Sequence, residues 1–85
     1  MEYVVLAFRS RAHTVKFYEF LSSHGIYSEI VSTPKEAGVG CGLSVKISKS
    51  QINLVRQALS ILSLSSFAGI FLVKNLGEKR IVKSI

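Results

Sequence analysis

A single cysteine, Cys41, is the residue of this chain whose type and surroundings best suit covalent chemistry. It lies between Gly40 and Gly42, near the end of the glycine-rich stretch KEAGVGCG. Glycine neighbours leave the sulfur accessible and let backbone N–H groups point at it, which favours the reactive thiolate. A basic residue close to the sulfur would strengthen this effect, and the candidates are Lys35, Lys46 and Arg9. The residues alone leave open an unreactive small side chain in a surface loop.

Other kinds of reactive site find little support in the sequence. One cysteine permits neither an intrachain disulfide nor a site of four cysteine ligands, so we expect no metal and no cofactor. The segment GVGCGLS lacks the Lys-Ser/Thr ending of a nucleotide phosphate loop and the spacing of a dinucleotide-binding loop. His13 and His24 fall within or at the end of a predicted helix, where an exposed or capping histidine is the common explanation. We therefore expect no enzyme with its own turnover.

The composition predicts one domain spanning residues 1–85, because 48% hydrophobic and 19% charged residues suit a chain that packs a single core. A lone cysteine fits a reducing compartment, and the apolar run Val4 to Phe8 is too short for a secretory signal. The uncharged stretch Gln57 to Val73 is shorter than the ~20 apolar residues that span a bilayer. We expect a cytoplasmic protein with no membrane partner. The net charge of +6 favours acidic partners or nucleic acid, although a solvated surface explains the scattered basic residues equally well.

The elements that must position Cys41 follow from residue patterns on both sides of it. The β-branched and aromatic run from Tyr3 to Phe8 predicts a central strand. Ser10 is placed to cap a helix that runs to about His24 and stops at Gly25. A second strand is predicted from Ile26 to Ser32, ending at Thr33-Pro34.

Beyond the loop, Leu43, Val45 and Ile47 alternate with polar residues and predict a half-buried strand. Ser48 and Gln51 form a capping-box pattern that starts a second helix, reaching about Ser63. A further strand is predicted over 67–74, a turn over 75–78 and a short basic strand over 80–85.

The order β-α-β-β-α-β is that of the ferredoxin-like, split βαβ sandwich, an α+β fold in which two helices cover one face of an antiparallel sheet. A short extra strand at the C-terminus extends it. The other sheet face is expected to stay open and to carry Tyr3, Phe67 or Phe71, and a homodimer would hide it.

Three segments resemble one small bacterial family, the selenium or sulfur carrier-like proteins: AFRSRAHTVKFYEFL, STPKEAGVGCGLSVKIS and LSLSSFAGIFLV. The resemblance extends over nearly the whole chain, and its most specific parts are Cys41 to Lys46 and Ser65 to Phe71. It implies a carrier that accepts sulfur or selenium on Cys41, as a persulfide or selenosulfide, from a donor protein and passes it to an acceptor protein. A lone accessible cysteine suits this role, since no second cysteine can close a disulfide on it.

The resemblance also implies roles for the neighbours of Cys41. Gly40 and Gly42 would give access and amide donors, and Lys35 or Lys46 would offset the charge of a terminal sulfur. The remaining supporting residues would shape the start of the loop or pack beneath it, and they are Thr33, Pro34, Ser65, Ser66 and Phe67.

Two other functions remain open from the sequence. A binding module could use the open sheet face and the basic charge to bind an acidic protein or, less favoured, nucleic acid. A regulatory small-molecule domain could pair with a second copy through its sheet edges.

Overall fold

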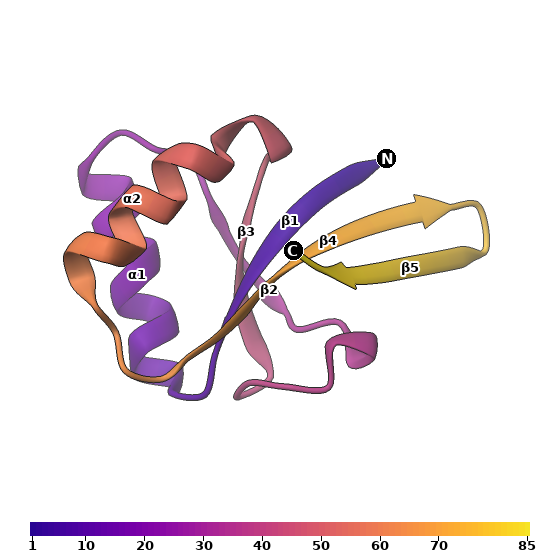
Figure 1. The fold of residues 1–85 in the computed structure, drawn as a ribbon, viewed down its shortest axis with the longest axis horizontal. Coiled ribbons are helices and arrows are strands. Elements are labelled where there is room, and N and C mark those ends of the chain that lie inside the picture. The colour runs from indigo at the N-terminus through magenta and orange to yellow at the C-terminus, as the bar shows by residue number, and fades with distance from the viewer.

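Strand β1 (Glu2–Phe8) is the centre of the fold because it is apolar on both faces. Its residues Val4 to Phe8 are fully buried, as the sequence predicts for a central strand. The computed structural model describes residues 1–85, and in it both helices lie on one side of a five-stranded antiparallel sheet (Figure 1). The expected α+β fold with two layers is therefore confirmed.

The remaining elements follow along the chain in the expected alternation. They are α1 (Arg11–Ser23), β2 (Glu29–Ser32), the short 3-10 helix η1 (Lys35–Ala37), β3 (Leu43–Ile47), a second 3-10 helix η2 (Lys49–Gln51), α2 (Ile52–Leu62), β4 (Phe67–Leu76) and β5 (Lys79–Ser84). The basic C-terminal segment forms β5, which pairs with β4 across a tight turn at Gly77 and Glu78.

The strands lie side by side in the order β2-β3-β1-β4-β5, and every neighbouring pair is antiparallel. The connection through α1 joins β1 to β2 across the intervening β3. The connection through α2 joins β3 to β4 across β1. Each crossover therefore spans one strand, so the two halves of the chain interleave in one sheet.

The predicted second strand is wrong at its start, because residues 26–28 form no strand and Ile26 bonds back to the preceding helix. Gly25 has a positive φ of 72°, and the Ile26 N–H donates to the Leu21 carbonyl at 2.9 Å. This bond closes the C-terminus of α1 and turns the chain, so pairing with β3 begins only at Glu29.

The sheet face away from the helices is not open, contrary to the prediction. A small second core of Val5, Ala7, Phe71 and Val73 lies on that face, and Ala37 and Val39 pack against it. These two residues belong to the segment after β2, which Figure 1 shows on the side of the sheet opposite the helices. The glycine-rich loop thus covers part of the face that the sequence left exposed.

Phe67 lies on the helix side of the sheet, not on the face where the sequence placed it. The pairing of β1 with β4 shifts between Ala7 and Phe8, so that Phe8 faces Phe67. The two rings meet edge to face with their centroids 5.7 Å apart.

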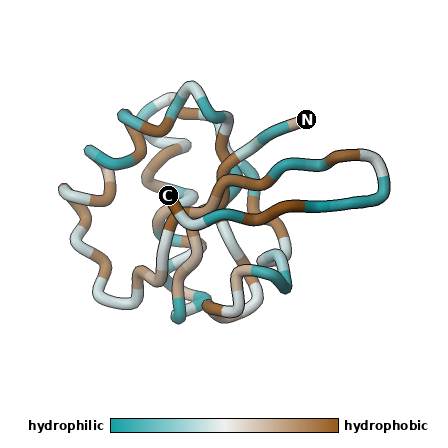
Figure 2. The backbone as a smooth tube through the Cα atoms, turned by 45° about the vertical axis from the view of Figure 1, so that its right-hand side comes forward, coloured by the Kyte–Doolittle hydropathy of each residue, from teal (hydrophilic) through white to brown (hydrophobic).

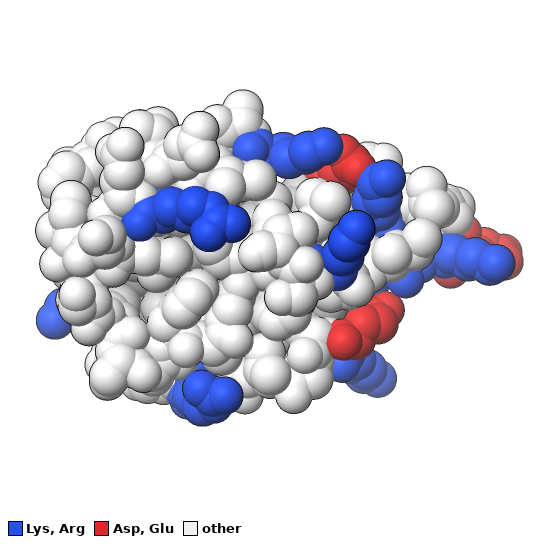
Figure 3. All heavy atoms as spheres, in the orientation of Figure 1, with Lys and Arg blue, Asp and Glu red and all other residues white.

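The surface agrees with a scattered basic charge. Lys and Arg side chains are spread over the face drawn in Figure 3 and do not form one continuous patch there. Figure 2 shows hydrophilic stretches on both strands of the β4–β5 hairpin, with a hydrophobic one just before its tip, and β5 at the sheet edge carries Lys79, Arg80 and Lys83. Charged edge strands discourage pairing with another chain. No helix of the structure is long and apolar enough to cross a membrane.

Candidate functional site

The loop that carries Cys41 is fastened to the sheet at both ends. At its start the Thr33 N–H donates to the Gly42 carbonyl at 2.9 Å, and the Thr33 hydroxyl lies 2.7 Å from that of buried Ser44. At its end the Cys41 N–H donates to the Phe8 carbonyl at 2.9 Å. The loop therefore has a fixed course although it lacks strand pairing of its own.

The backbone and its surroundings favour glycine at the position before the cysteine. Gly40 has a φ of 95°, and a Cβ there would lie 3.2 Å from the Phe8 carbonyl oxygen and 3.5 Å from the Ala7 Cβ. Gly42 has the same φ, but a Cβ there would meet nothing within 4 Å. The two glycines thus differ: Gly40 allows the loop to approach the end of β1 closely, whereas Gly42 only allows the turn.

The sulfur of Cys41 points toward the first turn of α1 while the residue remains exposed. Its Sγ lies 3.7 Å from the Thr14 hydroxyl oxygen and 3.7 Å from the Leu43 carbonyl oxygen. Thr14 is fully buried, and its hydroxyl can also donate to the Ser10 carbonyl at 3.2 Å. A third acceptor is the Leu43 carbonyl, 3.4 Å from the same hydroxyl. The single hydroxyl proton can serve any one of the three acceptors, so Thr14 can turn its donor to the sulfur when the sulfur is anionic.

Thr14 is the functional candidate that sequence reasoning missed. Thr14 lies on the buried face of α1 together with Phe17 and Leu21, and all three are fully buried. A polar side chain among apolar neighbours on a core-facing stripe is the signal that pointed to a partner, since buried hydroxyls are almost always hydrogen-bonded. The sequence does not say that the partner is Cys41.

The structure brings together one group of the predicted site residues in the loop itself. Thr33, Pro34, Lys35, Gly40 and Gly42 line a shallow hollow of about 250 Å³. Cys41 does not line this hollow, and its sulfur points to Thr14 of α1. Lys35 thus shares the loop with Cys41 but takes no contact with the sulfur.

Lys46 is not brought to Cys41. It is five residues further along, about 16 Å at the rise of a strand. Its ammonium stands 4.5 Å from the centre of the Tyr3 ring, on the sheet face opposite the helices. The predicted role of Lys46 in offsetting charge on the sulfur has no geometric basis.

Ser66 and Phe67 support the elements around the cysteine and do not touch the sulfur. The Ser66 carbonyl accepts the Arg9 N–H at 2.8 Å, and its hydroxyl lies 2.6 Å from His13 Nδ1. His13 is half-buried in this contact, so it is neither free nor a mere helix cap. Phe67 packs on Phe8, whose carbonyl holds Cys41. Both residues therefore fix the end of β1 and the start of α1.

An ion pair fastens the loop to the last strand. Arg80 of β5 binds the Glu36 carboxylate of η1 through two hydrogen bonds, at 2.7 and 3.1 Å. The hydrogen bond from Arg80 holds the pKa of the Glu36 carboxyl below its usual value and raises the pKa of Arg80. No group of three or more His, Cys, Asp or Glu side chains lies close enough to hold a metal ion.

The fold and this loop define an α+β domain that presents one exposed thiol on a fastened glycine-rich loop. The chain belongs to the family described as "Putative Se/S carrier protein-like", which matches residues 3–63. The match includes Cys41 and its loop but ends before Ser65 to Phe71, so that segment of the resemblance lies outside it. Comparison with curated proteins and with solved structures found no match.

Proposed function

We propose that this protein carries sulfur or selenium on Cys41, as a persulfide or selenosulfide, between a donor and an acceptor protein. The observation that carries the proposal is that the only thiol of a chain in this family is exposed on a fastened loop, with a buried hydroxyl 3.7 Å from its sulfur. With no second cysteine, the loaded sulfur cannot be displaced by a thiol of the same chain.

Loading is a transfer of one sulfur atom and needs no separate oxidant. The Cys41 thiolate attacks the outer sulfur of a donor persulfide, R–S–SH. The donor leaves as the thiolate R–S⁻, and the transferred sulfur becomes the outer sulfur of Cys41–S–SH. A sulfur–sulfur bond forms as another breaks, and the electron pair leaves with the donor thiolate. Unloading repeats the step, with the acceptor nucleophile attacking the outer sulfur and the Cys41 thiolate leaving. Selenium follows the same path when a donor presents it in place of the outer sulfur.

Thr14 acts in this proposal as a positioning residue. Its hydroxyl can donate to Sγ when Cys41 is a thiolate, both before loading and as the leaving group in unloading. The N-terminus of α1, where Ser10 accepts the His13 N–H at 3.2 Å, carries the partial positive charge of the helix dipole. Thr14 lies in the first turns of this helix, so that charge is on the side of the sulfur that faces Thr14.

The test is to incubate the reduced protein with a low-molecular-weight persulfide and follow its intact mass. Wild type is expected to gain the mass of one sulfur atom, to lose it on reduction, and to pass it to a thiol acceptor. Cys41→Ser is expected to gain nothing. A matched control is the Cys41→Ser/Ser60→Cys double variant, which moves the thiol to an exposed position on α2. Equal loading and unloading rates at the two positions would show that the loop contributes nothing, and would refute the proposal.

The contribution of Thr14 is tested with a pair of variants. Thr14→Val keeps the shape of the side chain and removes its hydroxyl, whereas Thr14→Ser retains the hydroxyl. Slower transfer in Thr14→Val with recovery in Thr14→Ser, and a shift of the pH profile in the first only, supports hydrogen bonding to the sulfur. A loss in both variants would point to packing instead.

The proposal extends to the setting of the protein. A carrier of this kind has no turnover of its own, works with protein donors and acceptors, and belongs in the reducing cytoplasm, where a lone thiol persists. We also assign the fold to the ferredoxin-like class, which the interleaved order β2-β3-β1-β4 supports, with β5 as an addition at the edge.

A further inference from the structure

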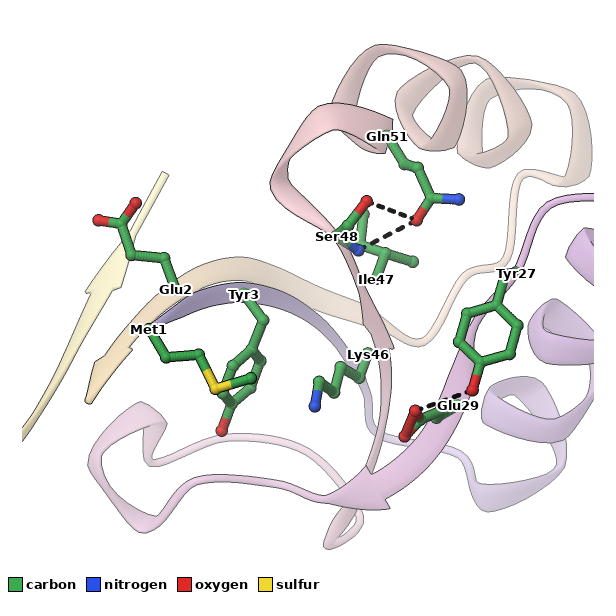
Figure 4. Close-up of a pocket in the computed structure, with 9 residues that line it drawn as sticks. All are labelled: Met1, Glu2, Tyr3, Tyr27, Glu29, Lys46, Ile47, Ser48 and Gln51. Atoms are coloured by element: carbon green, nitrogen blue, oxygen red, sulfur yellow. Dashed lines mark hydrogen bonds between the residues drawn. The ribbon is translucent and has the colours of Figure 1, made fainter.

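A second hollow lies at the opposite end of the sheet from Cys41, where β1 and β2 begin and β3 ends. Its volume is about 320 Å³, near the lower end of the range for small-molecule sites. Figure 4 shows the side chain of Lys46 between Tyr3 on one side and Glu29 on the other, with Tyr27 beyond. These four residues come from three different segments and face one space.

Two opposite charges face this hollow without neutralising each other. Lys46 and Glu29 are direct cross-strand partners, a position in which opposite charges usually pair. They form no salt bridge here. The Lys46 ammonium instead stands over the Tyr3 ring at 4.5 Å, and one oxygen of Glu29 accepts the Tyr27 hydroxyl at 3.0 Å.

Glu2, the other carboxylate at this hollow, differs from Glu29 because its charge is paired. Glu2 lines the same hollow, but its two oxygens are bound by Lys49 at 2.9 Å and Lys74 at 3.3 Å. Its charge is therefore already neutralised by the protein. One ammonium and one carboxylate, those of Lys46 and Glu29, remain available to a ligand.

Part of the wall of the hollow is apolar and aromatic, and Ser48 and Gln51 add polar groups. Tyr3 and Tyr27 contribute rings and Ile47 and Met1 contribute aliphatic surface. Tyr27 leaves 74% of its surface exposed at the rim. A large aromatic side chain held at such a rim, with its hydroxyl fixed to Glu29, gains buried surface when a ligand with an apolar group enters.

We propose that this hollow is a binding site for a free α-amino acid with a large apolar or aromatic side chain. Its carboxylate would bind Lys46, its ammonium would bind the free oxygen of Glu29, and its side chain would lie against the exposed Tyr27 ring. A zwitterion matches a site with one open charge of each sign, whereas a simple anion or cation would leave one of them unpaired. The site is separate from Cys41, so the proposal does not depend on the carrier function.

The test is a titration of the full-length protein with L-phenylalanine, followed by the backbone amide resonances of residues 27–29 and 46–48 and by calorimetry. Two analogues serve as ligand controls: phenethylamine lacks the carboxylate and 3-phenylpropionate lacks the ammonium. Each is expected to bind at least about tenfold more weakly than phenylalanine, since each loses one charge-assisted hydrogen bond. Either analogue binding as tightly as phenylalanine would overturn the zwitterion match.

Protein variants separate this site from the rest of the surface. Lys46→Met and Glu29→Gln are each expected to weaken phenylalanine binding about tenfold or more. Both residues are half-buried and neither forms a salt bridge, so the fold is expected to tolerate the change. Lys83→Met, which removes an exposed lysine from β5, and Cys41→Ser are expected to bind as wild type does. No resonance shift in the wild type at millimolar phenylalanine, or equal losses in Lys83→Met, would refute the site.

Discussion

Replacing Gly40 by alanine should both destabilise the fold and disturb the attachment of Cys41. The substitution adds a Cβ 3.2 Å from the Phe8 carbonyl oxygen, which is tighter than ordinary contact, at a φ of 95°. That same oxygen accepts the Cys41 N–H. The new atom therefore lies close to the hydrogen bond that holds Cys41 to β1.

The expected magnitude follows from a comparison with Gly42→Ala. Both glycines have a φ of 95°, so each substitution carries a backbone strain of about 1–2 kcal/mol. At Gly42 nothing lies within 4 Å of the added atom, so the backbone strain is the whole expected loss in the free energy of unfolding. At Gly40 weakening the hydrogen bond to Phe8 adds about 1 kcal/mol. The variants should differ by that amount, which corresponds to about 4–8 °C in Tm for a domain of this size.

Urea unfolding of the two variants and wild type measures this difference, and the alkylation rate of Cys41 in the same samples reports on the loop. Gly40→Ala should be the less stable variant and should change the alkylation rate more than Gly42→Ala does. Equal stabilities, or a larger loss in Gly42→Ala, would falsify the reading of Gly40 as the close-approach position.

Three further predictions concern the Glu36–Arg80 ion pair, the hydrophobic core and the capping box at Ser48. Glu36→Gln should lower the free energy of unfolding at neutral pH because it removes the ion pair with Arg80. The pKa of Glu36 is lowered from 4.5, so the ion pair contributes fully above pH 4.5 and its contribution disappears as the pH falls through the lowered pKa. Urea unfolding of the variant and the wild type should therefore converge in acid, and a difference that persists there would contradict the prediction. Phe17→Ala, at a fully buried ring 5.4 Å from Phe8, should cost about 3–5 kcal/mol in thermal or urea unfolding, well above Phe20→Ala at a half-buried position; similar losses would argue against this account of the core. Ser48→Ala, which breaks the capping box with Gln51, should cost about 0.5–2 kcal/mol, and an unchanged urea midpoint would exclude a capping role.

Much of the fold could be predicted because its elements are specified by local signals. The apolar run of β1, the Ser10 cap, the stop at Gly25 and the capping box at Ser48 all act within a few residues, and each is found in the structure. The predicted second strand starts too early because residues 26–28 have a strand-like pattern, whereas in the structure a backbone hydrogen bond ties Ile26 to Leu21 of the helix and pairing begins at Glu29.

The candidate site also has one part that the sequence predicts and one part that depends on the fold. Composition and neighbouring glycines single out Cys41, and that choice needs no fold, because a lone thiol between two glycines is a property of the chain. Its surroundings depend on residues distant in sequence. Thr14 reaches the sulfur from 27 positions away, because α1 lies against the start of β3.

Lys46 shows most clearly what cannot be predicted from the sequence. In the sequence it is close to Cys41, but alternation along β3 and the rise of the strand send it to the other sheet face and the other end, beside Tyr3 and Glu29. The sequence by itself determined which residue is the candidate for covalent chemistry and which elements surround it. Only the tertiary structure decided which side chains meet, because contacts across the sheet depend on strand order and register, and neither is encoded within any single segment.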